Sequence, residues 1–200
     1  MRSQLSMEPR EESRWIAAAQ GGDDLAFARL VEHYAKPVHN LCYRMLGDPA
    51  EAEDAAQETF LKAYQKLKSY DPLRSFPTWL LSIGAHHCID QLRRRRFQLV
   101  SLDTVRRRPA GRDSQPEKLV EQAQSKQSLQ GELARLGAYE RAAVVMRYWY
   151  DLSYEEIGQA LGLSVSAVKS RLHRARRDLA AGAETARQVS AREGSGITTA

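Results

Sequence analysis

Apolar residues recur at helical spacing through most of this 200-residue chain, and no segment shows the sustained alternation typical of a β-strand. The widest apolar stripe consists of Phe27, Leu30, Val31, Tyr34, Val38, Leu41, Cys42 and Met45. A stripe of this width covers the buried face of a helix. The pattern therefore predicts an all-α fold, in which Pro37 is the point where this helix could kink.

The boundaries of the following helices are marked by residues that commonly end or begin a helix. Gly47 suits the end of the first long helix, while Asp48 can cap the next helix and Pro49 fits its first position. The buried stripe of that helix consists of Ala56, Phe60, Ala63 and Leu67. Turn-forming residues then predict a loop over 69–75, and another apolar helix is expected over 76–96.

The second half of the chain contains a predicted helix-turn-helix. Ser153 and Glu156 form a capping box that starts a short helix, and Ser164 can cap the helix after it. The shared core would consist of Ile157, Leu161, Val168 and Leu172, which leaves Ser166, Lys169, Ser170, His173, Arg174 and Arg177 on the outward face. A basic second helix in this motif is typical of proteins that read duplex DNA in the major groove. The alternative is an ordinary surface helix with charged residues.

Composition along the chain divides it into two small helical domains. Residues 97–116 carry Pro, Gly and Ser without a lasting period, which predicts a flexible, basic linker. We therefore expect an N-terminal extension over 1–22, a first domain over 23–96, this linker, a second domain over 117–181 and a disordered tail over 182–200.

Charge is segregated along the chain, whose formal net charge is +5. Five acids and no base lie between Asp48 and Leu61, whereas eight arginines lie between Arg93 and Arg112, and residues 169–177 contain no acid. Two basic zones indicate two contacts with a polyanion, and the acidic zone indicates a different partner. For the acidic zone, a solvated helix face is the simpler alternative.

The consecutive residues His86, His87 and Cys88 are all possible metal ligands. Adjacent residues of a helix are rotated by roughly 100°, so these three side chains leave the helix in different directions. We therefore expect no metal site, and we expect His87 and Cys88 to pack against the core. Cys42 also lies in an apolar helical pattern, so both cysteines are predicted to be reduced thiols.

A narrow edge of the same helix carries Trp79, Ser82, His86, Asp90 and Arg93, and it continues into the arginines up to Arg96. An aromatic followed by cationic groups suits stacking on bases and pairing with phosphates. The alternative is a tryptophan at the margin of the core, followed by solvated arginines at a helix C-terminus, where positive charge is favourable. The sequence of this helix leaves both interpretations open.

The sequence contains no apolar run of the roughly 20 residues that span a bilayer, and its first residues lack the apolar centre of a signal peptide. We therefore expect a cytoplasmic protein without membrane insertion.

Three segments together resemble a known family. They are Ala52–Phe60 (AEDAAQETF), Phe76–Arg95 (FPTWLLSIGAHHCIDQLRRR) and Tyr154–Arg176 (YEEIGQALGLSVSAVKSRLHRAR). In this order and spacing they are similar to the signatures of extracytoplasmic-function (ECF, group 4) sigma factors of the sigma-70 family. The resemblance covers about residues 23–181 and implies a σ2 domain and a σ4 domain joined by a linker.

The resemblance also implies roles for individual residues. The polymerase β′ clamp helices would contact Glu53, Asp54, Gln57 and Glu58, with the β subunit as a further partner. The minus-ten strand would contact Ser69, Asp71, Arg74, Ser75, Trp79, His86, Asp90, Arg93 and Arg94. The minus-thirty-five duplex would contact Ser166, Ala167, Lys169, Ser170, His173, Arg174 and Arg177. It implies a non-enzymatic subunit without a cofactor, bound to promoter DNA and controlled by an anti-sigma factor.

Several positions depart from the family pattern. The family usually has Asn at the position of His86, Ala at Gly84 and Gly158, Pro at Gly137 and Ser164, and Gly-Thr at Ser166-Ala167. Since His86 and Ser166 fall on the expected DNA-facing surfaces, the promoter sequence of relatives cannot be transferred to this chain. Two other classes are weighed against a sigma factor: a helix-turn-helix regulator, which would not need the acidic helix, and a nucleic-acid enzyme, which would need clustered carboxylates or a metal.

Overall fold

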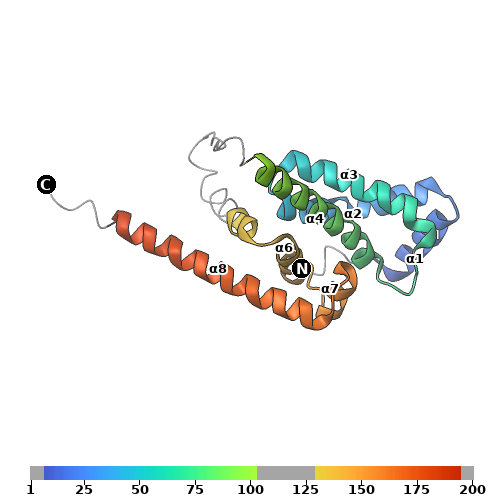
Figure 1. Cartoon of the computed structure of the whole chain (residues 1–200). Helices are drawn as coiled ribbons and strands as arrows, with labels where there is room; N and C mark the ends of the chain where they lie inside the picture. Colours follow the sequence, from blue (N-terminus) through green and yellow to red (C-terminus); the bar gives the residue numbers. More distant parts are fainter. Residues whose placement is uncertain (1–6, 103–128, 195–200) are drawn as a thin grey trace.

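The computed structural model describes residues 7–102 and 129–194, and these ranges contain helices and no strand (Figure 1). The prediction of an all-α fold is therefore confirmed. The helices form two bundles, one before and one after the gap at 103–128.

The first bundle contains α1 (Pro9–Gln20), α2 (Asp24–Leu46), α3 (Pro49–Lys66) and α4 (Phe76–Leu102). Helix α2 lies at its centre and packs against the other three. Its predicted apolar stripe supplies much of the core, with Leu30, Tyr34, Val38, Leu41, Cys42 and Met45 at most 1% exposed. Helix α2 ends at Gly47 in the left-handed region, and the Asp48 carboxylate accepts a hydrogen bond from the Glu51 backbone N–H to start α3. The predicted boundary between these helices is confirmed.

Helix α1 differs from the expected N-terminal extension. It packs against α2 through the buried residues Ile16 and Ala19. The Gln20 side chain also donates hydrogen bonds of 3.0 Å to the backbone carbonyls of Leu67 and Tyr70. The first bundle therefore begins near Pro9. A local sequence pattern could not indicate this, because the hydrogen bonds of Gln20 join residues about 50 positions apart.

The long helix α4 also differs from its predicted extent. It continues past Arg96 to Leu102, so residues 97–102, which were assigned to the linker, are helical. Residues 103–116 of the predicted linker lie outside the described residues.

The second bundle contains a helical segment over 129–135, followed by α6 (Ala138–Trp149), α7 (Tyr154–Leu161) and α8 (Val165–Gly194). The capping box of Ser153 and Glu156 starts α7 as predicted. Gly162, with φ of 65°, allows the tight turn into α8 at low steric cost. The predicted core residues Ile157, Leu161, Val168 and Leu172 are at most 2% exposed. The helix-turn-helix is therefore present.

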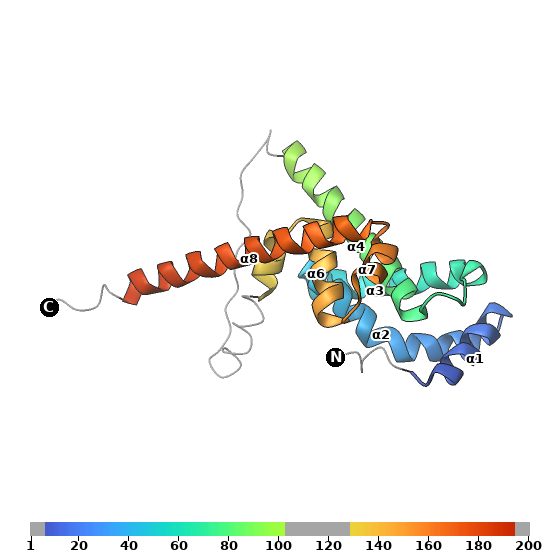
Figure 2. The same cartoon turned by 90° about the horizontal axis from the view of Figure 1, so that it is seen from below.

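Helix α8 is longer than predicted and projects away from the rest of the described structure (Figure 2). Residues 182–194 of the predicted disordered tail are helical, while residues 195–200 lie outside the described residues. Residues 165–194 contain no proline, so no proline ends the helix at residue 181.

The two bundles pack against each other through α6 and α7, which contact α2 and α4. The Tyr150 hydroxyl donates a hydrogen bond of 2.6 Å to the carbonyl of Pro37, and the Arg141 guanidinium donates one of 2.5 Å to the carbonyl of Met45. The Gln130 amide donates to the carbonyls of Tyr43 and Arg44. The sequence shows no sign of this interface, in which these four hydrogen bonds end on backbone oxygens.

Candidate nucleic-acid interface

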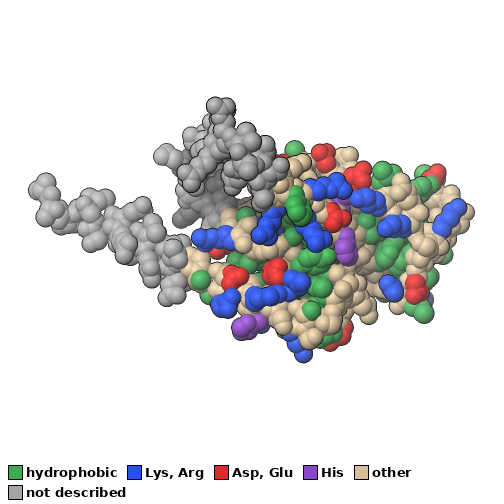
Figure 3. Space-filling view, in the orientation of Figure 1, with side chains coloured by type: hydrophobic (Ala, Val, Ile, Leu, Met, Phe, Trp, Pro, Cys, Tyr) green, Lys and Arg blue, Asp and Glu red, His purple; other side chains and the backbone are tan. Residues whose placement is uncertain are grey.

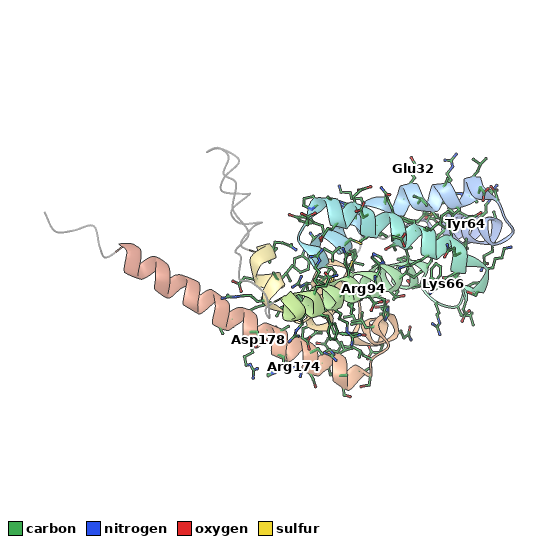
Figure 4. All side chains as sticks on the ribbon, turned by 45° about the horizontal axis from the view of Figure 1, so that its top comes forward. Glu32, Tyr64, Lys66, Arg94, Arg174 and Asp178 are labelled. Atoms are coloured by element: carbon green, nitrogen blue, oxygen red, sulfur yellow. The ribbon has the colours of Figure 1, made fainter. Side chains whose placement is uncertain are left out.

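Lys and Arg side chains gather over α4 and the first half of α8 on one face of the molecule (Figure 3). Two of these residues, Arg94 on α4 and Arg174 on α8, are labelled in Figure 4. The basic zones that the sequence places about 75 residues apart therefore come together on one side of the structure.

The loop before α4 begins with the 3-10 turn Leu67–Ser69. It is shaped by Asp71, whose carboxylate accepts a hydrogen bond of 2.9 Å from the Leu73 N–H and whose carbonyl accepts one from the Arg74 N–H. The predicted minus-ten residues of this loop, Ser69, Asp71, Arg74 and Ser75, are all exposed. An Asx turn of this kind keeps a short loop in one conformation without burying its side chains.

Trp79 lies at the margin of the first bundle, where it is half-buried. Its ring packs against Tyr70 and Phe76, with centroid distances of 4.8 and 5.5 Å. Burial, followed by the charges of Glu12 and Asp71, raises the pKa of Tyr70 to about 12. Trp79 therefore lies at the margin of the core, with part of its side chain exposed.

A hollow of about 360 Å³ lies beside Trp79. Its walls come from the loop and α4, through Leu73, Arg74, Ser75, Thr78, Trp79 and Ser82, and from α7, through Glu156, Gln159 and Ala160. The predicted minus-ten edge thus borders the second bundle.

The outer edge of α4 continues with His86, Asp90, Arg93 and Arg94, which are exposed. The His86 Nδ1 lies 2.8 Å from the Ser82 carbonyl, so Nδ1 must donate this hydrogen bond. Within the described ranges, no ion pair involves Arg93, Arg94 or Arg96.

Arg95 differs from its neighbours because it forms an ion pair with Glu51 of α3. The contact joins α3 to α4 inside the first bundle. Arg95 therefore already has a partner for its charge, unlike Arg93 and Arg94, the two arginines of this run predicted to contact the minus-ten strand.

The acidic residues of α3 form a surface beside α4, since Asp54 and Glu58 line one groove with Asp90 and Arg94. The four predicted polymerase-binding residues, Glu53, Asp54, Gln57 and Glu58, are exposed, while Ala52, Ala55, Ala56 and Ala63 on the opposite side of the helix are buried. The Gln57 amide donates to the Glu53 carboxylate at 3.1 Å, and Glu58 lies 3.8 Å from Lys62. Glu53 also lies 3.9 Å from His39 of α2.

His87 was predicted to pack against the core, but the structure places it half-buried in a groove of about 460 Å³ between α3 and α4. Its Nδ1 lies 2.8 Å from the Lys62 Nζ. An ammonium group only donates, so Nδ1 accepts and His87 is neutral. Burial, followed by the charge of Lys62, lowers the pKa of His87. The cause of the difference is Lys62, which lies 25 residues away on another helix.

Cys42 and Cys88 are free, buried thiols, as predicted. A hydrogen bond to Cys42, followed by burial, raises the pKa of the Cys88 thiol. In the part of the chain that the structure describes, no group of three or more His, Cys, Asp or Glu side chains could hold a metal ion.

The outward face of α8 agrees with the sequence pattern. Ser166, Lys169, Ser170, His173, Arg174 and Arg177 are exposed, and Ala167 is half-buried. The Ser164 hydroxyl accepts a hydrogen bond of 3.2 Å from the Ala167 N–H and so caps the helix.

One residue that contacts this face could not be found from the sequence. Glu140 of α6 pairs with Arg171 at 2.7 Å and with Arg174 at 3.2 Å. It precedes these arginines by 31 and 34 residues and lies outside every motif, so no local signal connects them.

Comparison with known proteins assigns both bundles to one family. The sigma-70 region 2 family model matches residues 30–98, and the sigma-70 region 4 model matches residues 126–179. Over 172 residues the chain is 34% identical to the ECF RNA polymerase sigma factor SigW of Bacillus subtilis, covering 82% of this chain and 92% of that protein. The chain belongs to the ECF sigma factors. It therefore acts in promoter-specific transcription initiation by RNA polymerase.

Further relatives support the same family. The chain is 35% identical over 178 residues to the ECF sigma factor SigE of Mycolicibacterium smegmatis, covering 86% of this chain and 69% of that protein. Among solved structures it is similar to CnrH in complex with the cytosolic domain of CnrY, with a TM-score of 0.64, 25% identity, and coverage of 88% of this chain and 98% of that chain. It is also similar to the sigma factor RpoE of Bartonella quintana in complex with the anti-sigma factor NepR, with a TM-score of 0.60, 25% identity, and coverage of 76% and 93%.

The ECF sigma factors are initiation factors rather than enzymes. No helix among the described residues of this chain has the length and apolar character needed to cross a membrane.

Proposed function

We propose that this ECF sigma factor reads the minus-thirty-five element as duplex with α8 and holds the melted minus-ten strand with the loop before α4 and the outer edge of α4. The observation that carries the proposal is the position of both basic surfaces on one side of the molecule (Figure 3). Arg93 and Arg94 on α4, and Arg177 on α8, are exposed cations of these two helices. A promoter contacts both regions as one continuous polyanion.

The acidic face of α3 would bind the β′ clamp helices of core polymerase, with the β subunit as a further contact. Its exposed carboxylates, Glu53, Asp54 and Glu58, lie on a different helix from the cations of the DNA surfaces. Opposite charge on separate helices allows one subunit to hold polymerase and DNA at the same time.

Strand opening by this mechanism needs no cofactor or catalytic residue of the sigma factor. Unstacking costs a few kcal/mol per base step, and capture of a flipped base on an aromatic offsets about 1–3 kcal/mol of this cost. The hollow beside Trp79 is the best candidate for such capture. Because α7 lines the same hollow, a strand bound there would contact both bundles or displace α7.

Such a subunit works in the cytoplasm, where core polymerase and the chromosome are. The complex of RpoE with the anti-sigma factor NepR supports a further partner of this kind for the present chain. An anti-sigma factor would act by covering the polymerase-binding or DNA-binding surfaces.

Run-off transcription with purified core polymerase and fragments of genomic DNA tests the proposal. We expect discrete transcripts that start at a shared sequence pattern and appear only when this chain is added. A chain that binds specific duplexes but produces no transcript would instead be a helix-turn-helix regulator, and metal-dependent cleavage of the fragments would indicate a nuclease.

A further inference from the structure

Glu140 connects the first turn of α6 to the predicted recognition helix α8. Its Oε1 accepts hydrogen bonds from Arg171 Nη1 at 2.7 Å and from Arg174 Nη2 at 3.2 Å. The Glu140 side chain is only 18% exposed, whereas that of Arg174 is 53% exposed. One shielded carboxylate therefore holds an arginine that otherwise faces solvent.

The two arginines are held differently. The guanidinium of Arg171 also lies over the ring of Tyr139, 5.1 Å from its centroid, and its side chain is only 26% exposed. Arg174 has no ion-pair partner other than Glu140 among the described residues. Loss of the carboxylate would therefore leave Arg171 packed against Tyr139 but would free Arg174.

Gly137 provides the space for this carboxylate. A Cβ atom at position 137 would lie 2.5 Å from Glu140 Oε2, closer than non-bonded atoms approach. Position 137 is also one where this chain departs from the family pattern, which favours Pro. The glycine therefore leaves room for the carboxylate in the position that forms both ion pairs, and a side chain at 137 would displace it from that position.

We propose that Glu140 is a specificity-determining residue for duplex recognition, which orients Arg174 and withholds one positive charge from the phosphates. An arginine without a partner binds the phosphates of any duplex, and each phosphate that it neutralises adds about 0.9 to the slope of log affinity against log salt concentration. An arginine held by a carboxylate contributes less to this sequence-independent binding. The inference rests on the proposed role of α8 in binding duplex DNA.

Two duplexes and a salt series test the inference. The full-length chain is used to select a binding sequence from a random duplex pool, and fluorescence anisotropy then compares that duplex with a shuffled one at four salt concentrations. For Glu140→Gln we expect affinity for the shuffled duplex to rise about three- to tenfold and its salt slope to steepen by about 0.9. The ratio of the two affinities should fall, because the freed charge acts on both duplexes and the orientation of Arg174 is lost.

Gly137→Ala is a second, independent variant that keeps the charge of Glu140. Because the clash falls on the far end of a flexible side chain, the carboxylate can move while the fold remains, which circular dichroism would verify. We expect the same steepening of the salt slope, and no further change when both substitutions are combined. Glu155→Gln is the charge-matched control, since Glu155 is exposed on α7 and forms no ion pair with other described residues.

Several results would overturn the inference. One is a Glu140→Gln variant whose salt slope and affinity ratio match those of the original chain or of Glu155→Gln. Another is a selection that enriches no sequence, or a chain that binds neither duplex. None of these experiments uses polymerase, so run-off transcription tests the proposed function separately.

Discussion

At the scale of single residues, the two cysteines illustrate how burial controls reactivity. Cys42 and Cys88 come from different helices, are completely buried and share a hydrogen bond that contributes to the raised pKa of Cys88. The thiolate is the reactive form of cysteine, and here it is disfavoured. These thiols therefore suit packing rather than redox chemistry.

The expected result is that a thiol reagent such as Ellman's reagent modifies no cysteine in the native protein and two cysteines in guanidinium chloride. The absorbance of the thiolate that the reagent releases measures how many cysteines react in the native and in the unfolded protein. One thiol that reacts within seconds under native conditions would show that the first bundle opens easily or that a cysteine is accessible.

His87 predicts a dependence of stability on pH. Its pKa is lowered in the folded protein by burial and Lys62, partly opposed by Glu58 and Asp90, and Arg94 lowers it further. The unfolded chain therefore binds a proton at higher pH than the folded chain, so stability falls as pH falls below the ordinary pKa of 6.5.

Thermal unfolding at pH 7.5 and pH 5.5 would measure this effect. We expect the decrease in Tm on acidification to be smaller in His87→Gln than in the original chain. His173→Gln is the matched control, because His173 is exposed on α8 and should leave the decrease unchanged. Equal decreases in all three proteins would contradict the assignment to His87.

At the scale of helices, α3 has one buried face and one exposed, acidic face. One face packs against α2 and α4 through small residues, including Ala52, Ala55 and Ala63, which allow close approach. The other face carries the exposed acidic residues. A substitution on that outer face should therefore change binding without changing the fold.

The substitutions Asp54→Ala and Gln57→Ala together are expected to weaken binding to core polymerase about tenfold, equivalent to about 1.4 kcal/mol. Both side chains are exposed, so the thermal stability should stay nearly constant. Fluorescence anisotropy with labelled sigma factor and purified core polymerase measures the affinity. Glu11→Ala on α1 is the control, and unchanged affinity of the double variant would mean that this face is only solvated.

At the scale of the whole molecule, the packing of one bundle on the other is the main feature. The Arg141 side chain bridges them, since it donates to the carbonyls of Met45 in α2 and of Ala134 in the 129–135 segment. Burial lowers the pKa of Arg141, followed by the charge of Arg95. Carbonyls near the ends of helices partly compensate a buried cation, because the C-terminal end of a helix is negative.

Tyr150→Phe tests the contribution of the other buried contact between the bundles. The substitution removes the hydrogen bond to the Pro37 carbonyl and should lower the free energy of unfolding by about 1 kcal/mol. Urea denaturation measures the change. Tyr148→Phe is the matched control because Tyr148 is 52% exposed, and equal stability of the two variants would show that the bundles are not held together by this contact.

Much of the fold and part of the candidate site could be predicted from the sequence. The stripe on α2, the boundary at Gly47 and Asp48, and the capping box of α7 all depend on residues at most four positions apart. The same holds for the outward faces of α3 and α8. Helical periodicity and capping are local, so the amino-acid sequence alone determined these elements and the side chains that they expose.

Only the tertiary structure decided which residues from different helices contact one another. It added α1 to the first bundle, paired Arg95 with Glu51, placed Lys62 against His87 and brought Glu140 to Arg174. It also joined the two bundles through Tyr150 and Pro37, which are 113 residues apart. Such contacts depend on how the helices pack in space. A hydrogen bond from a side chain to a distant carbonyl or carboxylate produces no repeating pattern in the amino-acid sequence.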